Sequence, residues 1–343
     1  MRILIRTDVH LCQYSSILRL RGTQFSTRLE GVMKSVSWSE KMAEEHKCDY
    51  IVDMGDFFDK ATLNAEEIST LDKIEWSKSI PHIFLIGNHE IASATREFNS
   101  TQLFNLVPNI SVMRDIGTID AGETELVFLP YILESDRSPL TDLLKPRNKK
   151  RVVFSHNDLK GIQMGPVVST QGFEIDDIES NCDLFVNGHL HNGMKITDKI
   201  INLGNLTGQN FSEDALRYSH NIMILDTDTL TYELVENPNA FNFYKLGSLS
   251  QYTKKIEFKP NSIVSCSCNE AQLEAVKESL KQNPSVITSQ VTVERQQLKV
   301  DESSKVSADS LKMSDHRAQF RDYIINKYGS DEIVLSELEE VLR

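Results

Sequence analysis

The chain has 343 residues, 40% of them hydrophobic, and a formal net charge of -13 at pH 7. This length suits one large domain with additions or two domains, and no apolar run is long enough to span a membrane. The negative charge argues against a surface coated with positive charge for nucleic acid, but it does not exclude an enzyme acting on DNA, because bound divalent cations and local basic patches can make the phosphate contacts.

The cysteines and the first residues indicate a reducing environment. The five cysteines are scattered, and Cys266 and Cys268 lack a partner pair, so neither a zinc site nor a disulfide framework is implied. Residues 1–6 carry charges and open a strand-like run, which is not the pattern of a signal peptide. We therefore expect a cytoplasmic protein.

Residues 1–245 alternate strand-like apolar runs with helical patterns. Apolar residues at 3.6-residue spacing near 29–36 and a pattern at 63–77 predict helices. An early βα alternation followed by closely spaced strands predicts an α/β fold with two packed β-sheets flanked by helices. The expected strands are 3–5, 50–54, 82–86, 125–129, 151–154, 182–186, 200–203, 221–225 and 230–235.

The pattern changes near residue 245, so we expect 1–245 to form one domain. Residues 246–296 predict a small α/β capping module, which could bind DNA, and 297–314 read as a polar linker. Residues 315–343 predict two helices that have little core of their own to cover, so we expect them to bind a partner protein. The apolar residues of that pair are Phe320, Tyr323, Ile324, Leu338 and Val341.

Side chains of metal-ligand type follow five of the strand-like runs. In an α/β sheet, strand ends deliver such residues to one edge. Mixed His, Asp and Asn ligands without Cys suit manganese, iron or zinc in a hydrolytic site, and two ions about 3.5–4 Å apart can hold the attacking and leaving oxygens of a phosphoryl group. The residues are Asp8, His10, Asp56, Asp59, Asn88, His89, His156, His189 and His191.

The remaining histidines, His46, His82, His220 and His316, read as ordinary residues. A single strand-end histidine would also be weak evidence for a metal. The whole ordered set is a much stronger indication. Asp56 is the natural bridge between two ions, because a carboxylate has two oxygens whereas Asn88 offers one carbonyl.

Five motifs in order, across residues 1 to about 215, resemble the calcineurin-like metallophosphoesterases. This resemblance implies the four-layer fold of that superfamily and two divalent ions, for which we expect manganese, with magnesium, iron or zinc as alternatives. The motifs are Asp8-x-His10, Gly55-Asp56-x-x-Asp59, Gly87-Asn88-His89-Glu90, His156 and Gly188-His189-x-His191.

A narrower resemblance is to the SbcD-like nuclease subunits of double-strand-break repair and their eukaryotic, archaeal and phage relatives. Gly55–Asp59 and Gly188–His191 read much as they do in that family, and Leu203-Gly204-Asn205 followed by Phe211-Ser212-Glu213 is similar to its later Gly-Ser…Phe-x-Glu segment, with Asn205 departing at the Ser. A phage-encoded member would fit the length, which is shorter than that of most cellular members, and would place the protein in the host cytoplasm.

The resemblance also implies residue roles. Asp8, His10, Asp56 and His191 would hold one metal, and Asp56, Asn88, His156 and His189 the other. His89 would contact the scissile phosphate and protonate or stabilise the leaving oxygen. Asp59 would hydrogen-bond His89 and keep it oriented, although Asp59 also reads as a plain turn residue.

Two basic stretches are candidates for DNA contact, Lys149, Lys150 and Arg151 in one and Lys254 and Lys255 in the other. An interpretation as solvated loop flanks stays open for both. In the resembled family, helices in the region of 63–77 and 98–104 pair two nuclease subunits, so a homodimer is expected. The sequence does not separate this role from ordinary packing against the sheet, which residue by residue is the simpler explanation. The partner of the C-terminal helices would be the coiled-coil base of an SbcC-like ATPase.

We therefore predict a two-metal DNA exo/endonuclease subunit acting in double-strand-break repair or recombination. Another phosphoesterase of the same fold, a phosphatase or cyclic-nucleotide phosphodiesterase, is the first alternative. A non-catalytic scaffold of the same fold is the second, but it would have no chemical need for the ligand set and His89.

Overall fold

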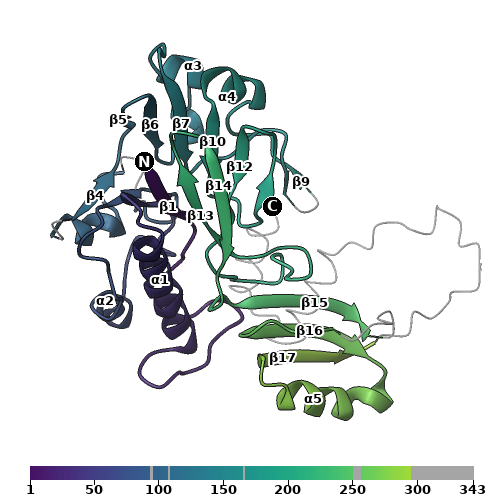
Figure 1. Ribbon diagram of the computed structural model, residues 1–343. Coiled ribbons are helices and arrows are strands. Elements are labelled where there is room, and N and C mark those ends of the chain that lie inside the picture. The colour runs from purple at the N-terminus through teal and green to yellow at the C-terminus, as the bar shows by residue number, and fades with distance from the viewer. Residues whose placement is uncertain (93–95, 107–108, 165–166, 250–255, 295–343) are drawn as a thin grey trace, which may run out of the picture. The chain divides into compact units, whose positions relative to one another are not determined.

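The computed structural model describes residues 1–92, 96–106, 109–164, 167–249 and 256–294. Residues Met1–Glu294 form one compact unit. Within it, two six-stranded sheets pack face to face, and a three-stranded sheet follows them in the chain (Figure 1). Among the described residues, no helix is both long enough and apolar enough to cross a membrane.

The first sheet has the strand order β14-β13-β1-β2-β3-β4. Its central strands β1 to β4 run parallel, so their carboxyl ends lie along the same edge, whereas β13 pairs antiparallel with β1 and with β14. The strands are β1 (Arg2–Arg6), β2 (Tyr50–Asp53), β3 (His82–Leu85), β4 (Ile110–Met113), β13 (Asn221–Asp226) and β14 (Thr231–Glu236).

The second sheet has the order β11-β12-β10-β7-β6-β5. Here β6, β7, β10 and β12 run parallel, and the edge strands β5 and β11 run antiparallel to their neighbours. The strands are β5 (Gly117–Ala121), β6 (Thr124–Leu129), β7 (Lys150–Ser155), β10 (Leu184–Asn187), β11 (Met194–Lys195) and β12 (Ile200–Asn202).

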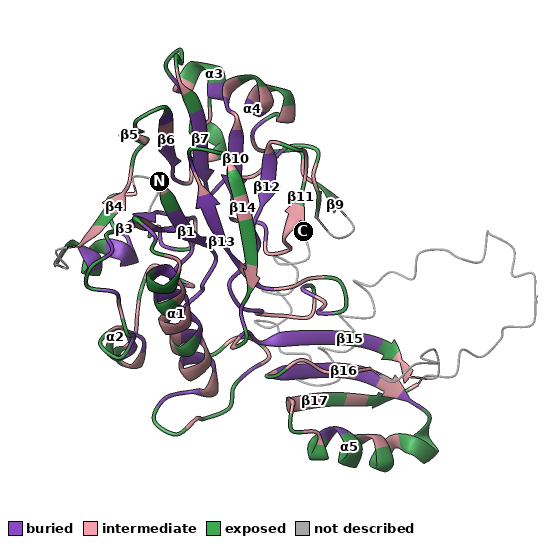
Figure 2. Ribbon diagram, in the orientation of Figure 1, coloured by how far each residue is buried: buried purple, intermediate pink, exposed green. Residues whose placement is uncertain are grey.

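Alternate residues of each strand face opposite layers, which gives four layers. Ile3 and Ile5 of β1 pack between the sheets against Phe128 and Phe154. Leu4 of β1 faces the other way, onto α1 (Thr27–Glu45) and α2 (Ala65–Leu71). The far face of the second sheet is covered by α3 (Leu140–Leu143) and α4 (Ile175–Asn181). Figure 2 shows the buried central strands between partly exposed helices, and the predicted two-sheet α/β class is confirmed.

The predicted helix over 63–77 is shorter than expected. Asn64 caps α2 in a reciprocal capping box with Glu67, and the helix ends at Leu71. Ile74 and Trp76 bury apolar surface without helical backbone, and the Trp76 indole donates to the Leu71 carbonyl at 2.9 Å. Short elements also appear that the periodicity did not indicate: η1 (Ser100–Leu106), η2 (Glu134–Asp136), β8 (Gln163–Met164) and β9 (Val167–Val168).

The three-stranded sheet is parallel and carries one helix. It consists of β15 (Asn242–Ser248), β16 (Ser262–Cys268) and β17 (Val286–Val293), with η4 (Glu270–Gln272) and α5 (Leu273–Gln282) between the last two strands. The sequence boundary expected at 245 therefore falls inside β15. The expected linker and C-terminal helical pair, with Phe320, Tyr323, Ile324, Leu338 and Val341, lie outside the described residues.

Candidate metal centre

The nine predicted site residues all follow parallel strands at their carboxyl ends. Asp8 and His10 come after β1, Asp56 and Asp59 after β2, and Asn88 and His89 after β3. The second sheet contributes His156 after β7 and, after β10, His189 and His191. Because the two sheets face each other, both sets of strand ends reach one location, and side chains from both sheets come within hydrogen-bonding distance there.

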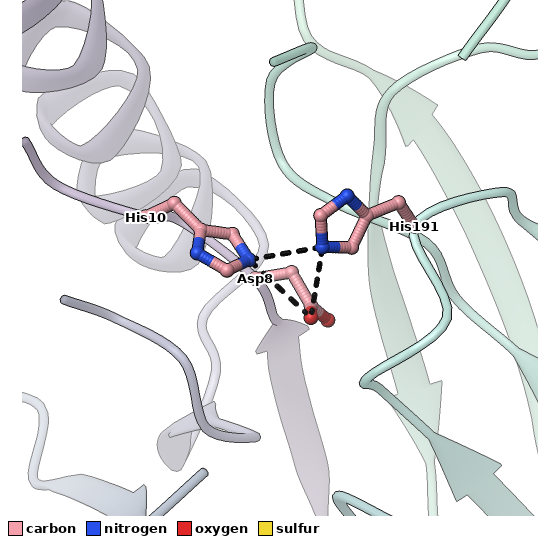
Figure 3. Close-up of side chains that lie close together, drawn as sticks. All are labelled: Asp8, His10 and His191. Atoms are coloured by element: carbon pink, nitrogen blue, oxygen red, sulfur yellow. Dashed lines mark hydrogen bonds and ion pairs between the residues drawn. The ribbon is translucent and has the colours of Figure 1, made fainter. Parts of the chain in front are cut away.

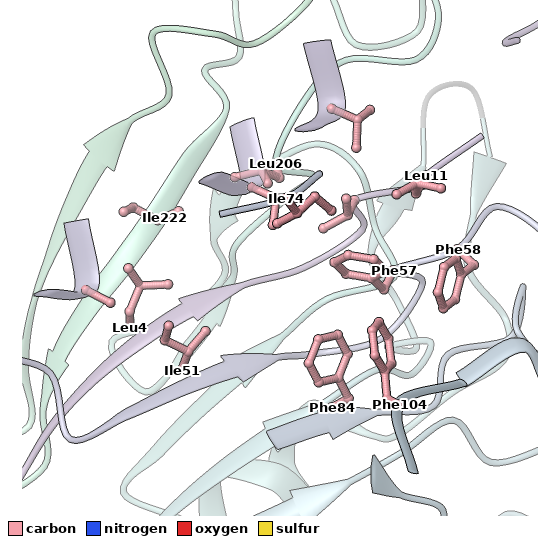
Figure 4. Close-up of a cluster of buried hydrophobic side chains, with 14 of the residues drawn as sticks. Leu4, Leu11, Ile51, Phe57, Phe58, Ile74, Phe84, Phe104, Leu206 and Ile222 are labelled. Atoms are coloured by element: carbon pink, nitrogen blue, oxygen red, sulfur yellow. The ribbon is translucent and has the colours of Figure 1, made fainter. Parts of the chain in front are cut away.

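The loop that carries Asp56 and Asp59 is anchored by two aromatic side chains. Phe57 and Phe58 are fully buried in the core on the α1 side of the first sheet (Figure 4). Their rings lie 5.3 Å from Phe84 and 5.5 Å from Phe104, respectively, at distances typical of aromatic pairs. The two apolar residues of this motif therefore fix the positions of the two carboxylates that flank them.

Backbone conformations at the strand ends are unusual for the residue types present. Asp8, His10, Asp56 and His189 have positive φ angles of 50°, 47°, 50° and 72°. Non-glycine residues adopt this left-handed region rarely, and such strain persists where the surrounding structure enforces it, often at functional sites. Gly87 leaves the space that Asp56 needs, because a Cβ atom at Gly87 would collide with the Asp56 carboxylate.

Asp8, His10 and His191 form the first group of possible ligands (Figure 3). One ligand atom of each lies within 4.8 Å of the others. The Nε2 atoms of His10 and His191 are 3.1 Å apart, and Oδ1 of Asp8 lies 3.8 Å and 4.0 Å from them. Three potential electron-pair donors from β1 and β10 thus converge on one small space.

A carboxylate stands behind each histidine of this group. Oδ1 of Asp59 lies 3.2 Å from Nδ1 of His10, and Oε1 of Glu213 lies 2.8 Å from Nδ1 of His191. The His191–Glu213 pair is hydrogen-bonded, so a proton on Nδ1 leaves the Nε2 lone pair of His191 available to a metal, as in the carboxylate–histidine pairs of metalloproteins. Asp59 approaches His10 closely without an aligned hydrogen bond.

Asp56, Asn88, His156 and His189 form the second group. Nε2 of His156 lies 3.1 Å from Oδ2 of Asp56 and 3.3 Å from Oδ1 of Asn88. Nδ1 of His189 lies 2.9 Å from the same Asn88 oxygen. His189 faces this group through Nδ1 because its Nε2 is held 3.1 Å from Oδ1 of Asp158, while Nδ1 of His156 is held 2.7 Å from the Met54 carbonyl.

Asp56 connects the two groups through a single oxygen. Its Oδ2 lies 3.1 Å from Nε2 of His156 and 3.9 Å from Nε2 of His10. Its Oδ1 accepts a hydrogen bond from the His89 backbone N–H at 2.9 Å. Oδ2 of Asp56 therefore lies between the two ligand groups, and the bridging role expected for Asp56 stays a prediction.

The donor set fits divalent cations. Oδ1 of Asp8 is buried and, among the described residues, receives no hydrogen bond. Burial alone lowers the pKa of His10, but the carboxylates of Asp59 and Asp8 outweigh it and raise that pKa to about 10. Burial likewise opposes charge on His156, yet Asp56 and Asp8 raise its pKa to about 9. A negative field that strong at buried nitrogen ligands favours cations.

His89 lies at the solvent-exposed rim of the site. Its side chain is 41% exposed, its Nε2 is 4.0 Å from Oδ2 of Asp56, and its ring packs edge-on against His10 with 4.8 Å between centroids. Asp59 and His89 are hydrogen-bonded, as predicted, but through the backbone carbonyl of Asp59 and not through its carboxylate. Nδ1 of His89 contacts the Asp59 backbone carbonyl at 2.9 Å, because the Asp59 carboxylate is directed at His10 instead.

Three residues around the site were given no role by the sequence reasoning. Glu213 and Asp158 orient histidines, as described above. Glu90 is fully buried and accepts the backbone N–H groups of Asp56, Phe58 and Gly87, so it ties the loop after β2 to the loop after β3. Its burial and the nearby Asp56 charge raise the pKa of Glu90 to about 7. In the sequence, only the position of Glu90 directly after Asn88 and His89 could have indicated a role at the site.

The predicted basic contacts lie elsewhere. Lys149, Lys150 and Arg151 sit at the start of β7, whereas His156 follows its other end. Arg151 is only 2% exposed and donates to Glu125 and to the Lys145 carbonyl, so it is a buried structural residue rather than a DNA contact. Lys149 pairs with Asp120, and Lys150 donates to the Asp228 carbonyl. Lys254 and Lys255 lie outside the described residues.

Residues 1–193, more than half of the chain, match the family model of the calcineurin-like phosphoesterases. The chain belongs to this family. All five strand-end motifs lie within the matched residues, and the phosphoesterase family as a whole uses divalent metals, in agreement with the ligand groups. Members of the calcineurin-like phosphoesterase family hydrolyse phosphoester bonds.

Individual relatives are distant. Over 171 residues, the phosphoesterase is 23% identical to protein 078R of Invertebrate iridescent virus 3, which is named as a phosphoesterase; the match covers 46% of this chain and 47% of the viral protein. The chain therefore spans about half the length of that relative.

Two solved structures show a similar arrangement over 69% of this chain. They are a dimetal phosphatase from Danio rerio, with 12% identity, 99% coverage and a TM-score of 0.37, and the calcineurin-like phosphoesterase YfkN from Bacillus subtilis, with 11% identity, 88% coverage and a TM-score of 0.35. Neither likeness bears on the substrate.

Proposed function

We propose that this phosphoesterase hydrolyses DNA phosphodiesters, as the nuclease subunit of a double-strand-break repair or recombination complex. The position of His89 is the observation that supports phosphodiester hydrolysis at this site. Its imidazole is exposed at the rim, 4.0 Å from the Asp56 oxygen that connects the two ligand groups. A substrate phosphate bound by cations at the two ligand groups would lie within reach of a proton donor.

Asp8, His10, Asp56 and His191 would hold one ion, and Asp56, Asn88, His156 and His189 the other. Divalent ions bound there would supply positive charge against the charge that develops on the phosphoryl oxygens. We favour manganese on the mixed His, Asp and Asn ligands, with magnesium, iron or zinc as alternatives.

His89 is positioned to serve the leaving group. Its Nδ1–H donates to the Asp59 carbonyl, and its backbone N–H donates to Asp56, so both the ring and the main chain are held. The opposite ring nitrogen, Nε2, faces Asp56 and is reachable from solvent. In the imidazolium form, Nε2–H can transfer its proton to the departing sugar oxygen.

Three sequence features favour DNA as the substrate over small phosphate esters or phosphoproteins, because a phosphoesterase that acts alone on those substrates does not need them. These are the similarity of Gly55–Asp59, Gly188–His191 and the Phe211–Glu213 segment to SbcD-like subunits, the small α/β module after the catalytic domain, and the apolar pattern of 315–343 beyond a polar stretch. The protein would act with an SbcC-like coiled-coil ATPase that binds the last segment.

A homodimer would form through the region around α2. Ile68 on α2 is 44% exposed and Phe98 is 61% exposed, and a hollow of about 840 Å³ in this region is lined by Ile68, Leu71, Trp76, Leu103 and Phe104. Exposed apolar surface of this kind is typical of interfaces. Sedimentation of wild type and of Ile68→Asp tests this: a dimer that the substitution leaves intact would exclude α2 from the interface.

The ATPase partnership is tested by co-purification with an SbcC-like ATPase, using the full chain and a chain without residues 315–343. We expect recovery of the ATPase only with the full chain. Equal recovery with both would remove the C-terminal segment as the binding site. DNA hydrolysis itself is tested by manganese-dependent cleavage of linear duplex DNA beside a small aryl phosphodiester.

A further inference from the structure

A hollow of about 880 Å³ adjoins the metal centre. Its lining includes the two ligands from the loop after β10, His189 and His191, together with Arg217, Tyr218 and Lys245. The hollow thus extends from the ligand groups to β15, the first strand of the small module. Arg217, Tyr218 and Lys245 were not singled out from the sequence, whereas Phe211 and Ser212 of the lining belong to the segment compared with SbcD-like subunits.

The segment before Arg217 and Tyr218, which lines one side of the hollow, is anchored at Glu213 and at Ala215. Glu213 is buried and holds His191, as described above. Two residues on, the backbone N–H of Ala215 donates to the Phe243 carbonyl at 2.8 Å, and Asp214 pairs with Phe243 as a parallel β-bridge. Arg217 and Lys245 therefore lie on adjoining segments that are tied to each other and to a metal ligand.

The positive charges of Arg217 and Lys245 in the lining are available to an anion. Arg217 and Lys245 are both exposed, and among the described residues neither takes part in an ion pair. By contrast, Arg147, Lys149 and Lys259 are each paired with a carboxylate. Asp214 is the one carboxylate of the lining, and its Oδ1 already accepts the Leu216 backbone N–H at 3.2 Å.

We propose that this hollow binds the single DNA strand next to the scissile phosphate, with Arg217 and Lys245 each contacting a backbone phosphate. Proteins that bind single-stranded nucleic acid usually combine a basic groove with aromatic side chains. The basic side chains contact successive phosphates, and a base stacks on the aromatic ring. Phe211 and Tyr218 are the aromatic residues of this lining. This inference rests on the proposed DNA hydrolysis and specifies where the strand lies.

Binding tests the assignment directly. In a His89→Ala background, which slows cleavage, a labelled single-stranded oligonucleotide is titrated by fluorescence anisotropy at several salt concentrations. Each phosphate contact contributes about 0.7 to the slope of log affinity against log salt on single strands, so Arg217→Ala with Lys245→Ala should reduce the slope by about 1.4. Arg217→Lys, which keeps the charge, should preserve it.

The matched control is Lys41→Ala with Lys277→Ala, which removes the same charge from exposed residues that do not line the hollow. This control should keep the parent slope. A reduction equal to that of the hollow variant would mean that total charge, rather than this site, governs binding, and would overturn the inference.

Cleavage rates on two substrates distinguish a failure of the proposed strand site from a failure of the proposed DNA hydrolysis. The rate on single-stranded or frayed DNA is divided by the rate on a small aryl phosphodiester measured with the same preparation, so that any loss of metal affects both. We expect this ratio to fall in the Arg217→Ala, Lys245→Ala enzyme and to stay at the wild-type value in the control. If wild type cuts DNA and the ratio and slope are unchanged in the hollow variant, the strand lies elsewhere; if wild type cuts only the aryl ester, the proposed DNA hydrolysis itself fails.

Discussion

Asp59 directs its carboxylate at His10, with 3.2 Å between Oδ1 and Nδ1, and touches His89 only through its backbone carbonyl. This arrangement gives Asp59 a different task from the one its sequence position suggested. Its carboxylate stands behind a proposed metal ligand, while the ring of His89 is held by the main chain of the loop after β2.

Asp59→Asn should therefore weaken metal binding. Loss of a carboxylate behind a histidine ligand typically costs about 10–100-fold in metal affinity. The measurement is a metal titration of chelator-treated protein, with Asp198→Asn, an exposed residue, as control. Unchanged metal affinity together with a slower reaction would show that Asp59 acts through His89 after all.

His89→Ala should keep both metals and lose activity. Because His89 belongs to neither ligand group described above, removing its ring should leave metal content intact while the rate falls about 10²–10⁴-fold, the scale of general acid catalysis. His46→Ala, at the C-terminal end of α1, serves as control. If metal-loaded His89→Ala reacts at the wild-type rate, the assigned role is wrong.

Asp56→Asn should reduce the occupancy of both metal positions together. Oδ2 of Asp56 is within 4 Å of a histidine nitrogen from each group, so the loss of its negative charge affects both. Elemental analysis after dialysis gives the metal content per chain. Two ions retained at wild-type affinity would exclude Asp56 as the bridge.

Glu213→Gln tests a support that only the structure revealed. Glu213 is buried, and besides His191 it accepts hydrogen bonds from Asn205 and from the Gln209 backbone. An amide keeps the shape but not the charge, so we expect affinity at the His191 position to fall about 10–100-fold with little change at the position of His156. Equal loss at both positions would point to a folding defect instead.

Strand ends made most of the site predictable. The apolar runs before Asp8, Asp56 and His156 are unmistakable, and parallel strands must deliver the residues after them to one edge. Contacts of Asp158 and Glu213 with histidines were not predicted, because these residues reach their histidines from loops 31 and 22 residues away in sequence. No local pattern encodes such a contact, nor the rotamer that turns Asp59 toward His10.

The fold was predictable to a similar extent. The alternation of strand-like and helical patterns and their lengths indicated the two sheets. The helix expected to continue to Ser77 ends at Leu71, because Ile74 and Trp76 bury their side chains from irregular backbone although their spacing fits a helix. Arg151 shows that a basic run in the sequence does not predict which of its charges are exposed. This arginine is buried and paired with Glu125.

A buried charge cluster behind the site should govern acid stability. Glu40 of α1 lies 2.6 Å from Arg6 of β1 and 2.8 Å from His82 of β3. Burial alone would raise the pKa of Glu40, but Arg6 and His82 lower it to about 2. A carboxylate whose pKa is depressed in the folded state stabilises fully above its unfolded pKa, about 4.3, and this contribution is lost as pH falls toward 2.

Glu40→Gln should therefore destabilise the protein at pH 7 by about 3–5 kcal/mol, because it leaves a buried arginine short of a partner. Its free energy of unfolding should also depend less on pH between about 4.5 and 2 than that of wild type. Urea unfolding of chelator-treated protein at several pH values measures both. Equal stability at pH 7 would show that Asp53 alone satisfies Arg6.

The most direct test of the proposed function is cleavage of linear duplex DNA by the metal-free enzyme with and without manganese, beside a small aryl phosphodiester. We expect manganese to restore hydrolysis of both substrates in wild type, and His89→Ala to lose both. Restored hydrolysis of the aryl ester with no cleavage of DNA, in the presence of the ATPase partner as well as alone, would contradict a DNA nuclease and leave a phosphoesterase that acts on small substrates.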